Sequence, residues 1–299
     1  MNEYEINTSQ TQLQAKKHFS QNFLVDANMR NRVVTGMKQI ADSRDVTLIE
    51  IGPGQGDVTS EVLTWQKDFT AIEIDPDAVE FLQANLDTNQ FELIHCDVMD
   101  LINSQLPNSK PKTKHQNDAD FVLPEDFNLI SSLPYHIGSR LLVDLAVIRP
   151  QTNFGVIHQK EVILKTQSRS NFTFFGAWLN LFWRCDYLFD LPKHCFRPQP
   201  NVVSAFLQGY SHNSQLENWL NTVNKREFAK QILKKLFSFP SKTLVNNLKA
   251  LDWNTESSLD FVDKLNLDSK TRLTWDNYQL ILKEVVNEQY AQQKLSTKT

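Results

Sequence analysis

The sequence lacks the features that mark membrane and secreted proteins. Its longest aromatic-rich apolar stretch, residues 172–183, is interrupted by Thr173, Gly176 and Asn180 and falls short of the roughly 20 apolar residues that a membrane span needs. We interpret it as helix core rather than as a base-stacking platform. The N-terminus carries no basic region followed by an apolar run, so it shows no secretory signal. The three cysteines form no CxxC pair, which fits a reducing compartment, and we expect a cytoplasmic protein without membrane contact.

Motifs that hold metal ions or hydrolyse nucleotides are also missing. The seven histidines are scattered without metal-ligand spacing, and neither HExxH nor CxxC accompanies them. No phosphate-binding GxxxxGKS/T loop is present, so we expect neither a bound metal nor nucleotide hydrolysis. With 40% apolar and 22% charged side chains over 299 residues, the composition excludes intrinsic disorder and allows one large domain plus a small one.

Apolar runs alternate with helical patterns through the first two hundred residues. The runs predict strands at 46–51, 69–74, 91–95, 127–131 and 154–158. Strands that alternate with helices form a parallel sheet whose two faces are covered by helices. Ahead of this sheet, Asp26 is expected to cap a helix whose apolar stripe packs on the sheet. The stripe consists of Met29, Val33, Met37 and Ile40.

The last hundred residues differ from the rest in charge and in pattern. Residues 1–199 carry 18 Lys and Arg against 25 Asp and Glu, whereas residues 200–299 carry 13 against 10. A polar stretch at 208–215 indicates a linker, and the patterns beyond it are purely helical. We therefore expect domains at 1–209 and 210–299. The basic residues between Lys225 and Lys249 face one acid, Glu227, and this face is either simply solvated or contacts phosphates.

A glycine turn follows the first predicted strand of the sheet. The buried strand that ends near Ile51 runs into Gly52, Gly54 and Gly56, and a helix pattern follows. Glycines let the backbone approach a ligand closely, and a helix N-terminus offers unpaired N–H donors. The turn by itself fits a dinucleotide site, a methyl-donor site or a plain tight turn.

Carboxylates follow the next two predicted strands. Glu73 lies about 20 residues after the glycine turn, where its carboxylate can accept hydrogen bonds from ribose hydroxyls. Nicotinamide cofactors and S-adenosylmethionine both use such an acid. Asp97 follows the third strand, where an adenine amino group can donate to it. Matched polar groups at consecutive strand ends favour a nucleoside-containing ligand over helix caps alone.

The fourth predicted strand ends in Ser131-Ser132-Leu133-Pro134-Tyr135, which suits chemistry on an adenine amine. The exocyclic nitrogen of adenine is a poor nucleophile because its lone pair is delocalised into the ring. Acceptors that hold its two hydrogens tilt the nitrogen toward tetrahedral geometry, so that the lone pair points at a sulfonium methyl. Ser132, a backbone carbonyl fixed by Pro134 and the ring of Tyr135 supply those parts. Attack on a sulfonium needs no strong base, and we expect no histidine to pair with this motif.

With these motifs the chain resembles the rRNA adenine N6-methyltransferase family, whose main branches are KsgA-type dimethyltransferases and Erm-type resistance enzymes. The matching patterns are a QNFL box at 17–26, EIGPGxGxxT at 50–59, VIExD at 72–75, D(A/V) at 97–98, QKEV at 159–162 and FxPxPKVxS at 196–204. The stretch 236–248 resembles the KsgA-type pattern FSQRRKTLRNNL better than an Erm one, which favours the KsgA branch.

The resemblance implies an α/β fold with a Rossmann-like, seven-stranded S-adenosylmethionine-dependent methyltransferase sheet and a small C-terminal all-helical, RNA-binding domain. It implies S-adenosylmethionine as the methyl donor and an adenine of small-subunit rRNA, or of a ribosomal subunit precursor, as the acceptor for a monomeric enzyme. The implied donor-binding residues are Gln21, Asn22, Leu24, Gly52, Gly54, Glu73, Asp97 and Ser132. The implied catalytic residues are Ser132, Leu133, Pro134, Tyr135 and Phe196, with Tyr135 and Phe196 stacking on the target base.

Three departures from the family pattern leave other hypotheses open. Ser132 stands where the family has asparagine, and a serine hydroxyl reaches less far than an amide oxygen. Asn201, residues 239–241 and Val245 replace basic residues, which removes phosphate contacts. Residues 103–120 predict an exposed loop longer than usual, whose lysines either compensate for that loss or only keep the loop soluble. The alternatives are an Erm-type enzyme on large-subunit rRNA, a non-catalytic RNA- or protein-binding paralogue and a nicotinamide oxidoreductase.

Overall fold

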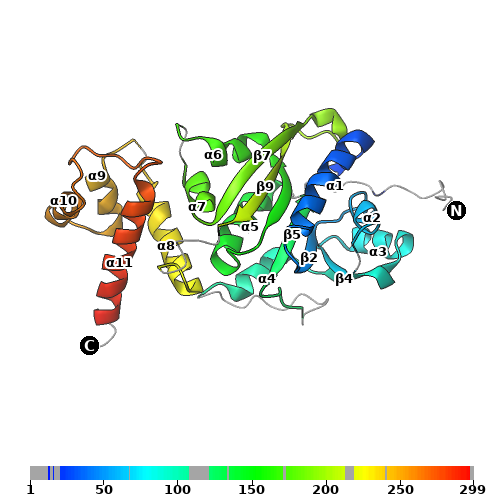
Figure 1. Ribbon diagram of the computed structural model, residues 1–299, viewed down its shortest axis with the longest axis horizontal. Coiled ribbons are helices and arrows are strands. Elements are labelled where there is room, and N and C mark those ends of the chain that lie inside the picture. The colour runs from blue at the N-terminus through cyan, green and yellow to red at the C-terminus, as the bar shows by residue number, and fades with distance from the viewer. Residues whose placement is uncertain are drawn as a thin grey trace.

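The computed structural model describes residues 13, 16, 21–66, 68–107, 121–132, 135–170, 173–212, 219–239 and 241–296. Figure 1 shows a twisted sheet flanked by helices, with a separate group of helices at one end. Most of the loop predicted at 103–120 lies outside the described residues. Its first three positions belong to helix α4 (Val98–Gln105), so that part of the prediction is wrong. No helix in the described ranges is long and apolar enough to cross a membrane.

Seven strands form the main sheet, and the five strands predicted from the sequence are confirmed with ends shifted by at most one residue. The seven strands of the sheet are β2 (Thr47–Ile51), β3 (Phe69–Glu73), β4 (Phe91–His95), β5 (Phe127–Ser132), β6 (Phe154–Gln159), β7 (Trp183–Leu191) and β9 (Ser204–Ser211). The order is β4-β3-β2-β5-β6-β9-β7. Strands β2 to β6 pair in parallel, and β9 runs antiparallel to both β6 and β7. The segments that follow β2, β3, β4 and β5 therefore meet at one edge of the sheet.

Helix α1 (Ala27–Ala41) packs on one face of the sheet against β5 and β6. A carboxylate oxygen of Asp26 accepts a hydrogen bond from the Met29 N–H at 2.8 Å and caps the helix. This hydrogen bond confirms the predicted cap. The predicted apolar stripe is buried at Val33, Met37 and Ile40, which confirms the predicted packing. Short helices α2 (Thr59–Val62) and α3 (Pro76–Asn85) follow β2 and β3.

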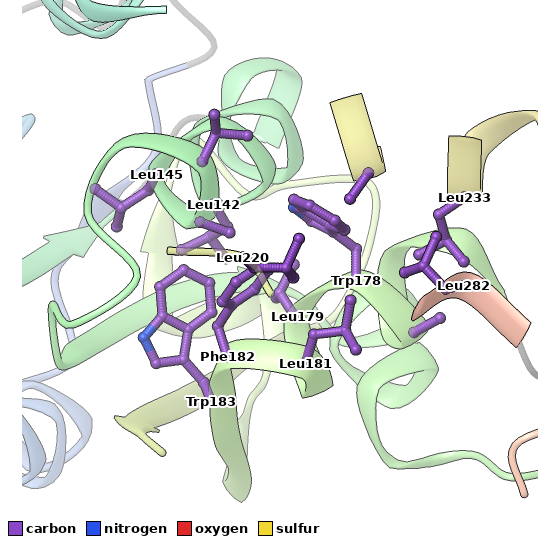
Figure 2. Packing of buried hydrophobic residues seen from close by; sticks show 14 of the residues in the cluster. Leu142, Leu145, Trp178, Leu179, Leu181, Phe182, Trp183, Leu220, Leu233 and Leu282 are labelled. Carbon is purple, nitrogen blue, oxygen red and sulfur yellow. The ribbon is translucent and has the colours of Figure 1, made fainter. Parts of the chain in front are cut away.

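Helices α4, α5 (Tyr135–Ile148), α6 (Lys160–Gln167) and α7 (Phe174–Phe182) add to a second, larger core cluster. Successive residues of a strand point to opposite faces, so Leu48 of β2 belongs to the cluster under α1 while Ile49 belongs to this one. Figure 2 shows Trp178, Phe182 and the neighbouring Trp183 of β7 among leucines of α5 and of the C-terminal helices. The aromatic stretch is helix core, as interpreted from the sequence.

The C-terminal part is helical, as predicted. It contains α8 (Val223–Leu236), α9 (Leu244–Leu248), α10 (Thr255–Lys264) and α11 (Tyr278–Ser296), which gather at one end of the molecule (Figure 1). The linker predicted at 208–215 is wrong in its first four residues, because β9 continues to Ser211 and pairs there with β7. The division into domains at 1–209 and 210–299 stays a prediction.

Two of the basic residues counted between 225 and 249 join α8 to α5 and do not form a surface. Arg226 is buried and donates from Nε to the Val147 carbonyl at 2.6 Å and from Nη1 to the Leu220 carbonyl at 2.9 Å. Burial lowers the pKa of Arg226 to about 10. Lys230 Nζ lies 2.8 Å from a carboxylate oxygen of Asp144 on α5. Neither side chain is available for phosphate; Lys234, Lys235, Lys242 and Lys249 are exposed.

Candidate active site

A cavity lies where the polar segments after β2, β3, β4 and β5 meet, and it holds about 1180 Å³ of empty space, part of it open to solvent. The cavity is lined by every described residue that the resemblance assigned to donor binding or catalysis. Leu133 and Pro134 lie outside the described residues. We call Gly52, Gly54, Glu73 and Asp97 the donor half of the cavity, and Ser132, Tyr135 and Phe196 the acceptor half.

The glycine turn of the donor half has a backbone that ordinary side chains disfavour. Gly52, Gly54 and Gly56 have φ values of 69°, 59° and 83°, in the left-handed region that glycine adopts without steric cost. A Cβ atom at Gly54 would also lie 3.2 Å from the ring of Phe23, which lines the cavity. The turn therefore brings bare backbone against the cavity, as the sequence predicted.

Glu73 holds this turn in place from the end of β3. One carboxylate oxygen accepts from the Gly54 N–H at 3.0 Å, and the other accepts from the N–H groups of Ile74 and Asp75, both at 2.9 Å. Burial raises the pKa of the Glu73 carboxyl, and the three N–H donors oppose that rise. Glu73 thus fixes the turn and lines the cavity at the same time.

Asp97 combines a structural role with a place in the cavity. It caps α4, because a carboxylate oxygen accepts from the Met99 N–H at 2.8 Å. The half-buried side chain also lines the cavity. The two interpretations of such an acid, helix cap and ligand contact, are therefore compatible in this fold.

Glu50 is an acid of the cavity to which sequence reasoning gave no role. It lies in β2 directly before the glycine turn, is almost fully buried, and its Oε2 has no hydrogen-bond partner among the described residues. Burial raises the pKa of its carboxyl to about 8, and the nearby charge of Glu73 adds to this shift. A charged residue inside an otherwise apolar strand was the signal in the sequence that could have identified it.

Lys16 and Gln21 are held by Asp75, which follows β3. Lys16 Nζ lies 2.6 Å from Asp75 Oδ1, and the Gln21 side-chain amide donates to Asp75 Oδ2 at 2.7 Å. Burial would raise the pKa of the Asp75 carboxyl, but the hydrogen bonds from Lys16 and Gln21 lower it. Gln21, Asn22 and Leu24 line the cavity, and their implied binding of the donor stays a prediction. The contact of Lys16 with Asp75 joins residues too far apart in the chain for a local pattern to show.

The acceptor half is built by side chains that come from three separate elements, β5, α5 and the short strand β8 (Phe196–Arg197). Tyr135 begins α5, and its hydroxyl lies 2.5 Å from Ser204 Oγ on β9. Phe196, in β8, is 3% exposed; β8 pairs with β1 (Phe23–Leu24) so that Leu24 lies opposite Phe196. Ser132 is half-buried at the end of β5. His136 lines the same cavity, and the expectation that no histidine pairs with this motif stays a prediction.

Among the described residues, one group of possible metal ligands comes from the segments that precede α1 and β8. Asp26, His194 and Cys195 place one ligand atom each within 4.8 Å of one another. However, Asp26 is engaged in capping α1. Burial raises the pKa of the Cys195 thiol, and the charge of Asp26 raises it further, so the thiol is protonated rather than a ready ligand. We assign no metal to this group.

The charge of the cavity distinguishes the nucleoside ligands that the sequence left open. Its described lining includes the acids Asp57, Glu73 and Asp97, besides Glu50, whose raised pKa keeps it protonated at neutral pH, and it contains neither lysine nor arginine. An acidic wall repels the pyrophosphate of a nicotinamide dinucleotide but attracts the cationic sulfonium and ammonium groups of S-adenosylmethionine. The bare turn and the carboxylates thus fit S-adenosylmethionine. Together with the seven-stranded sheet, they define an S-adenosylmethionine-dependent methyltransferase.

Comparisons with known proteins give the family. The family described as ribosomal RNA adenine dimethylase matches residues 12–290, and the chain belongs to this family. A ribosomal RNA small subunit methyltransferase A from Mesoplasma florum is 30% identical over 264 residues, which are 87% of this chain and 93% of the relative. The protein of the same name from Campylobacter hominis is 30% identical over 276 residues, 90% of this chain and 94% of the relative.

Two solved structures share the fold. A dimethyladenosine transferase from Plasmodium falciparum has a TM-score of 0.68 at 18% identity, with 89% of this chain and 98% of that chain covered. The 23S rRNA methyltransferase ErmE has a TM-score of 0.58 at 19% identity, with 89% of this chain and all of that chain covered. Both support a methyltransferase sheet followed by a helical C-terminal part.

Proposed function

We propose that the protein is a KsgA-type enzyme that transfers methyl groups from S-adenosylmethionine to the N6 atom of an adenine in small-subunit rRNA. The observation that carries the proposal is the single cavity in which the donor half and the acceptor half meet. The small subunit is favoured because the relatives from Mesoplasma florum and Campylobacter hominis are named small-subunit methyltransferases. We propose a monomeric enzyme that acts on rRNA in the cytoplasm.

On the donor side, the backbone of Gly52 and Gly54 would meet the methionine part of S-adenosylmethionine, and Glu73 would accept hydrogen bonds from the ribose hydroxyls. Asp97 would accept from the adenine amino group. When bound, S-adenosylmethionine supplies a methyl group on a positively charged sulfur. Glu73 is already anchored by three N–H donors, so it meets a ligand without reorganising.

On the acceptor side, Tyr135 offers an aromatic ring to a base that has left its stack. Base–aromatic stacking is worth about 1–3 kcal/mol per base and helps to compensate for the lost stacking in RNA. Ser132 would accept a hydrogen bond from the target amine and so direct its lone pair. Phe196 is nearly buried, so a base would meet only the side of the ring that lines the cavity.

The test is methyl transfer from tritiated S-adenosylmethionine to purified small-subunit and large-subunit rRNA, each as naked RNA and as a ribosomal particle. We expect label on small-subunit RNA or its particle, and nuclease digestion should recover it as N6-methylated adenosine. Glu73→Ala and Tyr135→Ala are the loss-of-function controls. Label confined to large-subunit RNA would instead favour the Erm-type alternative. Unlabelled RNA in every arm, with protein that still binds S-adenosylmethionine, would contradict the proposal.

A further inference from the structure

We propose that His158 and Ser204 are positioning residues that fix the ring of Tyr135 for the target base. This inference rests on the proposed function, because it assigns a purpose to the acceptor half of the cavity. Neither residue is in the implied catalytic set, and Ser204 is the last residue of the motif at 196–204. They flank Tyr135 from two neighbouring strands, β6 and β9.

Ser204 fixes the hydroxyl end of the tyrosine. The Tyr135 hydroxyl and Ser204 Oγ are 2.5 Å apart, and Ser204 is fully buried, so the bond is shielded from competing water. A hydroxyl held at the far end of the ring restricts the rotation that would otherwise change the angle of the ring in the cavity. Ser204 therefore fixes the position of the Tyr135 hydroxyl.

His158 supports the ring of the tyrosine. The rings of Tyr135 and His158 are stacked, with centroids 6.3 Å apart and planes 17° apart. His158 is 1% exposed, and its Nε2 lies 3.0 Å from Ser139 Oγ, one turn further along α5. Its Nδ1 has no partner among the described residues. The imidazole is therefore placed to support Tyr135.

The backbone of α5 is shaped to admit the imidazole. A Cβ atom at Gly138 would lie 3.1 to 3.3 Å from three ring atoms of His158. The first turn of α5 therefore packs directly on His158. Burial lowers the pKa of His158 to about 4, so a neutral ring lies beside Tyr135 at physiological pH. No charge needs to be accommodated between α5 and β6.

The two positioning residues lie in neighbouring rungs of the sheet. In the antiparallel pair of β6 and β9, His158 lies opposite Ala205 and Gln159 lies opposite Ser204. The contacts to the tyrosine therefore come from adjacent backbone positions whose spacing the ladder fixes. This gives Tyr135 a rigid support, which matters because a misplaced base lowers the rate of transfer more than it lowers the affinity for RNA.

The experiment is a double-mutant cycle with Tyr135→Phe and Ser204→Ala, measured by methyl transfer to small-subunit rRNA. Each single variant should lower kcat about 5- to 10-fold, with little change in KM for RNA or in the dissociation constant of S-adenosylmethionine. The double variant should be no worse than either single variant, because both remove the same hydrogen bond. Ser211→Ala is the matched control: it removes a hydrogen bond from β9 to the Pro150 carbonyl and should leave kcat unchanged.

His158 is tested by His158→Phe and His158→Leu. The phenylalanine keeps a flat ring and should retain more of kcat than the leucine, while a purely structural role predicts equal losses that follow thermal stability. His212→Asn, at an exposed histidine, is the control. Wild-type kcat in the Ser204→Ala protein, or additive losses in the double variant, would overturn the inference. A wild-type enzyme that labels no rRNA would instead overturn the proposed function, and the wild-type arm separates the two failures.

Discussion

The two halves of the cavity are built in different ways. In the donor half, the glycine turn directly follows β2, its anchoring carboxylate belongs to the last residue of β3, and that carboxylate accepts from backbone N–H groups. In the acceptor half, Tyr135 depends on side chains from β6 and β9, the second of which is 69 residues away in the chain. Backbone contacts at strand ends repeat wherever the motif occurs, whereas side-chain support depends on the particular residues of this chain. The donor half is thus a property of the motif, and the acceptor half is a property of the packing.

The largest expected effect is the loss of donor binding in Glu73→Ala. The substitution removes the acceptor for three N–H groups and for the ribose hydroxyls, and hydrogen bonds to charged groups are worth about 1.5–3 kcal/mol each. Calorimetry should show the affinity for S-adenosylmethionine reduced by roughly 1000-fold. Glu80→Ala, at an exposed acid of α3, is the control and should bind normally. An unchanged affinity in Glu73→Ala would show that the donor half is not where we place it.

The next effect is on the free energy of unfolding, whose dependence on pH should differ between variants of Glu50 and variants of His158. Glu50, beside the donor half, has its pKa raised to about 8 by burial, and His158, behind the acceptor half, has its pKa lowered to about 4 by burial. Relative to Glu50→Gln, the wild-type free energy of unfolding should fall as pH rises from about 4.5 to about 8. Relative to His158→Phe, it should fall by about 3 kcal/mol as pH drops from about 6.5 to about 4.

These signs follow from which state holds the proton. Above pH 4.5 an unfolded Glu50 ionises while the folded one stays protonated, which favours unfolding until the folded group also ionises near pH 8. Below pH 6.5 His158 becomes protonated in the unfolded state, whereas in the folded state it stays neutral until about pH 4. This difference favours unfolding as the pH drops. Urea unfolding at pH 4, 5.5, 7 and 8.5 measures both effects. Parallel pH profiles of wild type and variants would show that the two groups are not buried as described.

Tyr135→Ala should affect the acceptor half alone. The lost stacking, about 1–3 kcal/mol, corresponds to a decrease of roughly 5- to 150-fold in kcat/KM for RNA. The dissociation constant of S-adenosylmethionine should stay within a factor of two or so of wild type, because the donor half keeps its backbone contacts. A large loss of donor affinity would contradict the division of the cavity into two halves.

The smallest effect is expected from Ser132→Asn. The amide oxygen reaches further than the hydroxyl and offers the same kind of acceptor, so methyl transfer should be equal to wild type or higher by a few fold. Ser132→Ala, which offers no acceptor, is the informative companion and should be slower. If the asparagine variant were much slower than wild type, the pocket would be adapted to serine in a way that the family pattern does not indicate.

Sequence patterns predicted the sheet, the capped α1 and the donor half, because each depends on residues close together in the chain. The five strands were found from apolar runs, and the glycine turn and Glu73 from their position after those runs. The support of Tyr135 and the contact of Lys16 with Asp75 were not found, because they join segments far apart in the chain. Arg226 and Lys230 were counted with the exposed basic residues, since charge alone does not show that a side chain bonds to a neighbouring helix.

A crystal structure of the wild-type protein with S-adenosylhomocysteine tests the division of the cavity most directly. We predict that the ribose hydroxyls contact Glu73, that the adenine amino group contacts Asp97, and that the sulfur faces the opening between Ser132 and Tyr135. The contradicting result is a cavity filled by the protein's own side chains, or a ligand bound elsewhere with both of its ends away from the glycine turn.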